Sequence, residues 1–117
     1  MNSKQKLGKR GEHIACTYLK KRRYEIIEKN FFCKLGEIDI IAKQENIIIF
    51  IEVKTRKNKY YGNPAEAINK TKKIHMYNVA KYYMQIKELR NIQVRFDAIE
   101  IMMERGEIKI NHIKQIL

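Results

Sequence analysis

The chain has 117 residues, of which 44% are hydrophobic, which indicates one domain, residues 1–117, with a core of its own and excludes a disordered chain. Lys and Arg number 25 and Asp and Glu 13, which gives a formal net charge of +12. Such a charge favours a polyanionic partner, nucleic acid before an anionic membrane surface. The alternative is a Lys-rich surface that serves solubility alone.

The start of the chain, Met1–Lys6, leads into no apolar segment of the signal-peptide type, and the longest apolar run is far too short to span a membrane. Cys16 and Cys33 form no CxxC pair and have no His at zinc spacing, so we expect two free thiols. Free thiols are typical of a reducing compartment. We therefore expect a cytoplasmic protein without a membrane partner.

Hydrophobic spacing predicts two helices and five strands. The first helix covers residues 4–23. The second begins at Asn63-Pro64-Ala65-Glu66, with Asn as N-cap and Pro at the first helical position, and runs to about residue 88. The predicted strands are 24–33, interrupted near residues 28–30; 36–43; 47–55; 93–102; and 107–113, the last two joined near Arg105-Gly106.

The predicted order is therefore α-β-β-β-α-β-β. The strand over residues 47–55 is apolar on both faces, which is typical of a central strand covered by helices. The second helix can act as a right-handed crossover, which makes the third and fourth strands parallel. We expect a mixed α/β (α+β) fold in which helices flank a central mixed sheet.

An acid and a lysine, Glu52 and Lys54, close the most hydrophobic run of the chain, and Asp39 lies within the preceding apolar segment. A two-residue turn at 45–46 would place Asp39 opposite Glu52 on one face of the sheet. A turn of three residues would put the two acids on opposite faces unless a bulge restored the register.

This grouping predicts a metal-dependent phosphodiesterase site. Asp39 and Glu52 can give two carboxylates to a Mg²⁺ or Mn²⁺ ion that keeps waters and takes phosphate oxygens as further ligands. Lys54 lies two residues from Glu52 and so on the same face, where it can orient water or stabilise phosphate charge. The alternative is a structural ion pair at the end of the sheet.

Two helical residues can extend this site. Glu12, beside the apolar stripe of the first helix, can act as a third acid, unless it is a solvated first-turn carboxylate favoured by the helix dipole. Lys72 falls within the apolar stripe of the second helix and so needs an anionic partner, which Glu52 or a substrate phosphate can supply. Its alternative is a side chain that reaches past the helix edge to water.

A basic, aromatic segment follows the third strand. Arg56, Lys57 and Lys59 lie next to two aromatic rings, a combination typical of surfaces that bind nucleic-acid phosphates and bases. The rings are those of Tyr60 and Tyr61. An ordinary solvated loop is the alternative. Further along, we expect Arg95 to pair locally in Arg95-Phe96-Asp97 and so to support the sheet.

Short blocks spread over nearly the whole chain carry a family resemblance: Gly11-Glu12-x-x-Ala15, Tyr18-Leu19, Asn30-Phe31, Gly36-Glu37-Ile38-Asp39-Ile40-Ile41, Phe50-Ile51-Glu52-Val53-Lys54-Thr55-Arg56, Gly62-x-Pro64, Lys72 and Arg95-Phe96-Asp97. Together they resemble the YraN-like family, a widespread bacterial group of predicted endonucleases. The chain departs from the family at Arg23, where the family usually has Gly.

The resemblance implies the restriction-endonuclease-like fold of the PD-(D/E)xK superfamily, similar to archaeal Holliday-junction resolvases. In that superfamily a helix Glu, a strand Asp and a Glu-x-Lys strand form the metal site. By this resemblance those positions correspond to Glu12, Asp39, Glu52 and Lys54, and Lys72 corresponds to the helix lysine.

We therefore expect a Mg²⁺- or Mn²⁺-dependent endonuclease that hydrolyses phosphodiester bonds in DNA, with junctions or branches as the structures it would select. A homodimer would suit the cleavage of junctions, although no heptad pattern indicates one. Two alternatives stay open: a non-catalytic nucleic-acid-binding module that uses Arg56, Lys57 and Lys59, and an assembly subunit in DNA processing.

Overall fold

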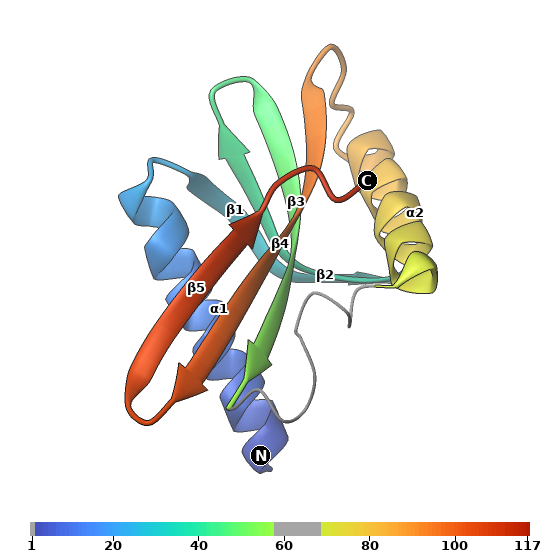
Figure 1. Cartoon of the computed structure of the whole chain (residues 1–117). Helices are drawn as coiled ribbons and strands as arrows, with labels where there is room; N and C mark the ends of the chain where they lie inside the picture. The colour runs from blue at the N-terminus through green and yellow to red at the C-terminus, as the bar shows by residue number, and fades with distance from the viewer. Residues whose placement is uncertain (1, 58–68) are drawn as a thin grey trace.

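The structure, a computed structural model, describes residues 2–57 and 69–117 (Figure 1). Its elements follow the predicted order α-β-β-β-α-β-β, and most predicted bounds are correct to within two residues. They are α1 (Ser3–Lys21), β1 (Glu25–Cys33), β2 (Gly36–Gln44), β3 (Ile47–Arg56), α2 (Lys70–Ile86), β4 (Gln93–Glu104) and β5 (Glu107–Ile113).

The five strands form one sheet in the order β1-β2-β3-β4-β5. Only the pair β3–β4 is parallel, and the other three pairs are antiparallel. The connection that contains α2 therefore links two parallel strands, as predicted. β3 is the central strand, and this position explains why its sequence is apolar on both faces.

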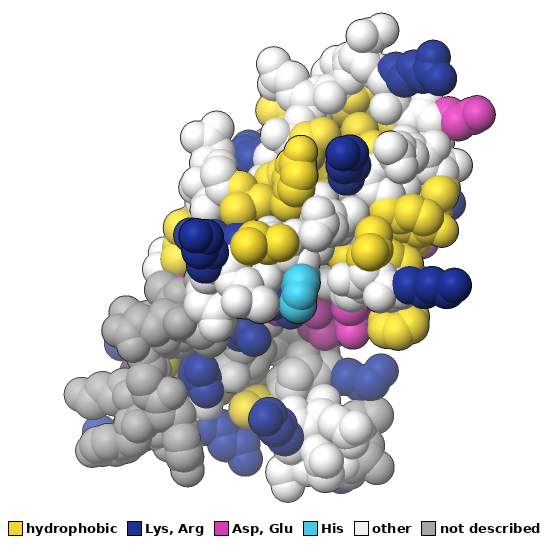
Figure 2. Space-filling view, turned by 90° about the vertical axis from the view of Figure 1, so that its right-hand side faces the viewer, with side chains coloured by type: hydrophobic (Ala, Val, Ile, Leu, Met, Phe, Trp, Pro, Cys, Tyr) yellow, Lys and Arg dark blue, Asp and Glu magenta, His cyan; other side chains and the backbone are white. Residues whose placement is uncertain are grey.

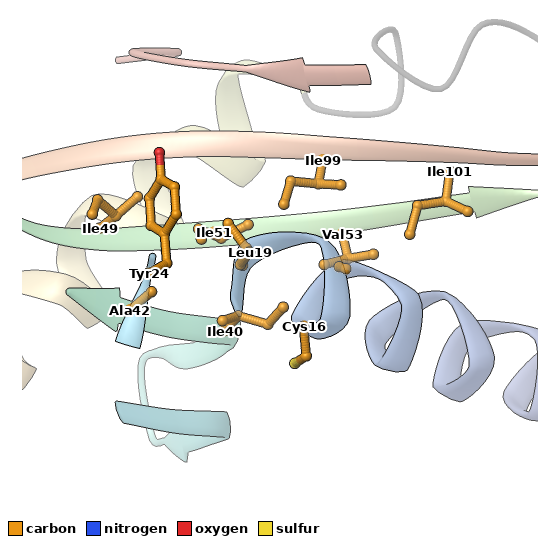
Figure 3. Packing of buried hydrophobic residues seen from close by; sticks show 11 residues of the cluster. Cys16, Leu19, Tyr24, Ile40, Ala42, Ile49, Ile51, Val53, Ile99 and Ile101 are labelled. Carbon is orange, nitrogen blue, oxygen red and sulfur yellow. The ribbon is translucent and has the colours of Figure 1, made fainter. Parts of the chain in front are cut away.

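The helices cover opposite faces of this sheet. On one face, α1 packs Ala15, Cys16 and Leu19 against Ile51 and Val53 of β3 (Figures 1 and 3). On the other face, four buried residues of α2 pack on strand side chains that alternate with those of the first cluster. The members of this second cluster include Met76, Val79, Tyr83, Ile48 and Phe50. Full burial of each such side chain contributes about 1.5–3 kcal/mol.

The end of α1 depends on a residue in a strained backbone conformation. The N–H of Tyr24 donates to the carbonyl of Leu19 at 3.0 Å, and that of Arg23 to the carbonyl of Lys20 at 3.1 Å. These two bonds form a Schellman motif, which requires a left-handed residue just beyond the helix. Arg23 is that residue, with φ of 65°. The helix therefore stops at Lys21, before the predicted end, and the position favours the Gly of the resembling family.

Two predicted element bounds are wrong. β1 is continuous rather than interrupted, because a bulge between Ile26 and Glu28 absorbs the irregularity. α2 begins at Lys70, where the Asn69 side chain accepts the N–H of Lys72 at 2.9 Å and acts as N-cap. The predicted start at residues 63–66 lies outside the described residues. The same helix ends at Ile86, which is half-exposed rather than part of the buried stripe.

Figure 2 shows the face of the molecule on the α2 side, where hydrophobic side chains gather in the upper half and Lys and Arg side chains are frequent in the lower half. Ile74 and Tyr77 of α2 are 50% and 53% exposed. Within the described residues, neither helix has the length and the apolar content needed to cross a membrane.

Candidate functional site

The register between β2 and β3 brings two acids together. Gln44 pairs with Ile47 across a two-residue turn at 45–46, and the pairing continues to Ile40 opposite Ile51. Asp39 and Glu52 are the next residues on the two strands, so the even-numbered turn that the site requires is present. The predicted two-residue turn is confirmed, and the register extended by one residue places the two acids opposite each other just beyond the last paired residues.

The carboxylate of Asp39 is fixed by the backbone of β3. Val53 N donates to Asp39 Oδ2 at 2.8 Å, just beyond the last β2–β3 residue pair. Burial raises the pKa of Asp39, and this effect outweighs the opposing contributions of the Val53 N–H and of Lys72. Asp39 is therefore held in one orientation but has a stronger tendency to bind a proton, or another cation, than a carboxylate in water.

Glu52 is almost fully buried, with 3% of the residue exposed. Lys72 Nζ lies 3.0 Å from Glu52 Oε1, and Lys54 Nζ lies 3.9 Å from the same oxygen. The other oxygen, Oε2, is buried and accepts no hydrogen bond from the residues that the structure describes. The structure thus brings the predicted strand pair Glu52–Lys54 and the helix lysine together, and Lys72 has the anionic partner that its position requires.

Burial and the neighbouring charges shift the pKa values of Glu52 and Lys72. Burial, followed by the charge of Asp39, raises the pKa of Glu52 to about 7, although Lys72 acts in the opposite direction. For Lys72, burial lowers the pKa, but attraction to Glu52 and Asp39 outweighs it and raises the pKa. The raised pKa values show that two ionised acids on adjacent strands are unfavourable here. An additional cation would therefore stabilise the pair.

Glu12 approaches the two acids from α1. Burial and the negative charge of Asp39 raise its pKa, while the Asn30 side chain lowers it. Since α1 begins at Ser3, Glu12 lies more than two turns inside the helix, and the first-turn alternative does not apply. The close approach of this helix depends on Gly11, because a Cβ at that position would lie 1.8 Å from Thr55 Oγ1 of β3.

The pair Asp39 and Glu52 fits a metal ion, whereas the set of three acids with Glu12 does not. Among residues 2–57 and 69–117, no three side chains of the types His, Cys, Asp and Glu lie close enough together to hold a metal ion. Glu12 therefore does not complete a three-acid group in this conformation. The pair Asp39–Glu52 does fit Mg²⁺, which is often held by one or two carboxylates together with waters and phosphate oxygens. The free, buried Oε2 of Glu52 supports this fit.

The predicted basic surface is only partly described. Arg56 is half-buried at the end of β3, and its Nε is buried and makes no hydrogen bond to any described residue. Lys57 is exposed. The other members of this prediction, Lys59, Tyr60 and Tyr61, lie outside the described residues.

Glu100 is a buried acid that the sequence analysis missed. It lies on β4 directly beside Lys54 of β3, and it is 8% exposed. An acid within the apolar run 96–103 is the same signal that indicated Glu52, and it could have indicated Glu100 as well. The charged groups near Lys54 therefore extend across one more strand than predicted.

Asp97 belongs to a separate polar network on the α1 side of the sheet. It is fully buried and accepts three hydrogen bonds from Arg95: Nε donates to Oδ1 at 2.9 Å and to Oδ2 at 3.2 Å, and NH2 donates to Oδ2 at 2.9 Å. The NH2 of Arg95 also donates to Tyr24 Oη at 2.9 Å, and His112 Nε2 lies 2.7 Å from Asp97 Oδ2. The prediction that Arg95 pairs locally is confirmed, whereas the part of His112 was missed.

An apolar hollow of about 530 Å³ lies between the second half of α2 and the start of β4. It shares no residue with the candidate site of Asp39, Glu52, Lys54 and Lys72. Its lining includes Tyr77, Met84, Leu89, Val94 and Phe96. An exposed apolar surface of this kind is what the hypothesis of an assembly subunit requires.

Comparison with known proteins places the chain in a family. The sequence model described as "Uncharacterised protein family UPF0102" matches residues 11–101. The chain belongs to the UPF0102 family. A UPF0102 protein of Caldicellulosiruptor saccharolyticus is 48% identical over 114 residues, which cover 96% of this chain and 97% of that protein. This membership confirms the YraN-like resemblance at the level of the family.

Relatives in other bacteria show similar coverage. A UPF0102 protein of Clostridium perfringens is 44% identical over 110 residues, or 92% of this chain and 90% of that protein. A UPF0102 protein of Clostridium botulinum is 51% identical over 98 residues, or 83% of this chain and 80% of that protein. The matched region of the UPF0102 model includes every acid and lysine of the candidate site, from Glu12 to Lys72, and also Glu100.

Proposed function

We propose that this UPF0102 protein is a metal-dependent endonuclease of the PD-(D/E)xK superfamily that hydrolyses phosphodiester bonds in DNA. The observation that carries the proposal is the group of Asp39, Glu52, Lys54 and Lys72 on one face of the sheet, where two acids on adjacent strands face two lysines. A buried acidic pair with raised pKa values is typical of sites that hold a cation for catalysis.

Asp39 and Glu52 would hold Mg²⁺ or Mn²⁺, and Glu12 would reach the same site from α1. When bound, the ion would supply an acidified water and would stabilise charge on the phosphate oxygens. The Val53 N–H fixes the orientation of Asp39 for this purpose. Lys72 neutralises Glu52 when no other cation is present, and Lys54, which is about one-third exposed, can turn toward a phosphate.

The choice of DNA as substrate rests on charge. The formal net charge of +12 favours a polyanion, and Arg56 and Lys57 extend the positive charge beyond the site along β3. Junctions and other branched structures are the proposed preference, on the resemblance to Holliday-junction resolvases.

The test is cleavage of labelled single-stranded, duplex, flap and four-way-junction DNA with Mg²⁺, with Mn²⁺ or with EDTA. We expect metal-dependent cutting that Asp39→Asn and Glu52→Gln abolish, while DNA affinity is retained. Glu45→Gln in the exposed β2–β3 turn is the matched control, since it removes one negative charge about 20 Å from the site. Equal cutting by Glu52→Gln and Glu45→Gln would contradict the proposal.

A second candidate is a non-catalytic nucleic-acid-binding module. It is favoured by the finding that, in the part of the chain that is described, three potential metal ligands do not converge. This candidate predicts salt-sensitive binding without a metal requirement and no cutting under any condition. Lys57→Ala would weaken such binding, whereas Asp39→Asn would leave it unchanged or strengthen it.

A further inference from the structure

Glu100 is a buried carboxylate with an incomplete set of partners. It is 8% exposed, and within the described residues its Oε1 accepts no hydrogen bond. Its Oε2 receives one long bond, from Asn111 Nδ2 at 3.4 Å. A buried carboxylate is unfavourable unless it is paired, so this position implies a cationic partner that is close but not engaged in this conformation.

The sheet places one cation directly beside it. Lys54 and Glu100 are partners in the parallel β3–β4 ladder, so their side chains leave the same face at the same level. Neighbouring strands lie about 4.8 Å apart, which is well within the reach of a lysine side chain. Glu52 pairs with Ala98, whose side chain is a single methyl group and carries no charge.

Lys54 is weakly held by its present partner. Its Nζ is 3.9 Å from Glu52 Oε1, whereas Lys72 binds the same oxygen at 3.0 Å. A contact near 4 Å is too long for a hydrogen bond, so the energy that keeps Lys54 beside Glu52 is small. Lys54 therefore has only a weak contact with Glu52, which already binds Lys72, and its strand position is directly beside Glu100, for which no ion pair is found among the described residues.

We propose that Glu100 is a positioning residue of this site, which provides Lys54 with an anionic partner that does not depend on Glu52. This role rests on the proposed function: Lys54 would be repelled by a metal ion held at Glu52, and Glu100 would then keep the lysine near the phosphate. The contact itself requires no nuclease activity. Glu100 does not touch the substrate, and it acts through Lys54 alone.

Arg56 is the rival partner for Glu100. It lies on the same face of β3, opposite Met102, and its Nε is buried without a hydrogen bond in the part of the chain that is described. Arg56 is two residues beyond the β3 residue that pairs with Glu100, so it is a diagonal neighbour, whereas Lys54 is the residue directly paired with Glu100. Direct neighbours interact more strongly than diagonal ones, which favours Lys54.

A double-mutant cycle on the metal-free protein tests the contact without reference to activity. The variants are Glu100→Gln, Lys54→Met and their combination, compared by denaturant unfolding. We expect Glu100→Gln to raise the unfolding equilibrium constant several-fold more with Lys54 present than with Met at position 54. Glu104→Gln, the same change four residues further along β4, should show no coupling to position 54. Additive effects, or coupling to Arg56→Met instead, would overturn the proposal.

Activity gives the second measurement. If the wild-type protein cleaves DNA, Glu100→Gln should lower kcat about tenfold and leave KM for DNA unchanged, because the lysine is misplaced while DNA contacts remain. An unchanged kcat would overturn the role of Glu100 in positioning. If the wild-type protein cleaves nothing in any metal, the proposed function fails, and the unfolding cycle still decides whether Glu100 holds Lys54.

Discussion

Lys72 of α2 and Glu52 of β3 form an ion pair of 3.0 Å between Nζ and Oε1, which ties the helix to the central strand. The pair joins the only helix on that face to the strand that carries the candidate site, within the described residues. Lys72 therefore both positions α2 and compensates the burial of Glu52.

Replacement of Lys72 by Met should destabilise the protein by about 1–3 kcal/mol, because Glu52 would remain buried without its closest cation. Urea unfolding at pH 8, where Glu52 is ionised, measures the effect. Lys81→Met, an exposed change on the same helix, is the control and should be close to neutral. Equal stability of the two variants would show that the ion pair contributes nothing to the fold.

The stability of the metal-free protein should fall as the pH rises from about 5 to about 8. The folded-state pKa of Glu52, about 7, exceeds the ordinary value of 4.5, so between these values the folded state binds a proton that the unfolded state has lost. Thermal unfolding in EDTA across this range measures the trend, and Glu52→Gln should flatten it. Added Mg²⁺ should raise Tm at pH 8 if the acids hold the ion. A flat wild-type profile would contradict the raised pKa.

Gly11→Ala should destabilise the protein by about 1–3 kcal/mol, since the new Cβ would lie 1.8 Å from Thr55 Oγ1 and 2.9 Å from Thr55 Cβ. Gly8→Ala, three residues earlier on α1, is the control. Among the described residues its Cβ meets nothing within 4 Å, and Ala is the better helix former by about 1 kcal/mol. Opposite signs for the two changes, measured by thermal unfolding, would confirm the close contact of α1 with β3.

Arg23→Gly should stabilise the protein by about 0.5–1 kcal/mol, because Gly adopts a φ of 65° without the Cβ strain that an L-residue has there. Arg23→Ala removes the same charge but keeps the Cβ, so it separates the backbone effect from the charge effect. A gain in Tm that is equal for Ala and Gly would assign the effect to charge.

Asp97→Asn should destabilise the protein by about 3–5 kcal/mol, because Arg95 would lose the carboxylate that it binds in the interior. Burial alone would raise the pKa of Asp97, but hydrogen bonds from His112, Arg95 and the Gln115 N–H outweigh it and lower the pKa. Tyr24→Phe, which removes one bond from Arg95, should lose only about 1 kcal/mol. Urea unfolding of both variants gives the comparison.

Much of the fold could be predicted because hydrophobic spacing matched the elements. The apolar character of β3 on both faces indicated its central position, and the signal at Arg105-Gly106 located the β4–β5 turn, where both residues have positive φ. The N-cap Asn69 was not predicted, because sequence alone does not single it out from other Asn residues, and the predicted start at 63–66 lies outside the described residues.

The candidate site could be predicted in part for a similar reason. Asp39, Glu52 and Lys54 were found because charged residues within apolar strands are rare and imply partners. Glu100 carries the same signal in β4, but only the parallel register shows that it lies beside Lys54. His112 lacks any local pattern, since its partner Asp97 is 15 residues away in the sequence.

The two-residue turn at Glu45-Asn46 has a consequence for how this protein can vary. Asp39 and Glu52 are equally distant from that turn along their strands. Whether the two acids face each other therefore depends on the length of the turn rather than on the residues next to the acids. Insertion of one residue there would leave both acids in the chain but send one of them to the α1 face of the sheet. Homologues that keep this chemistry should therefore tolerate substitutions in the turn far more readily than a change in its length, and deep mutational scanning of single-residue insertions would reveal this surface hairpin as a functional position.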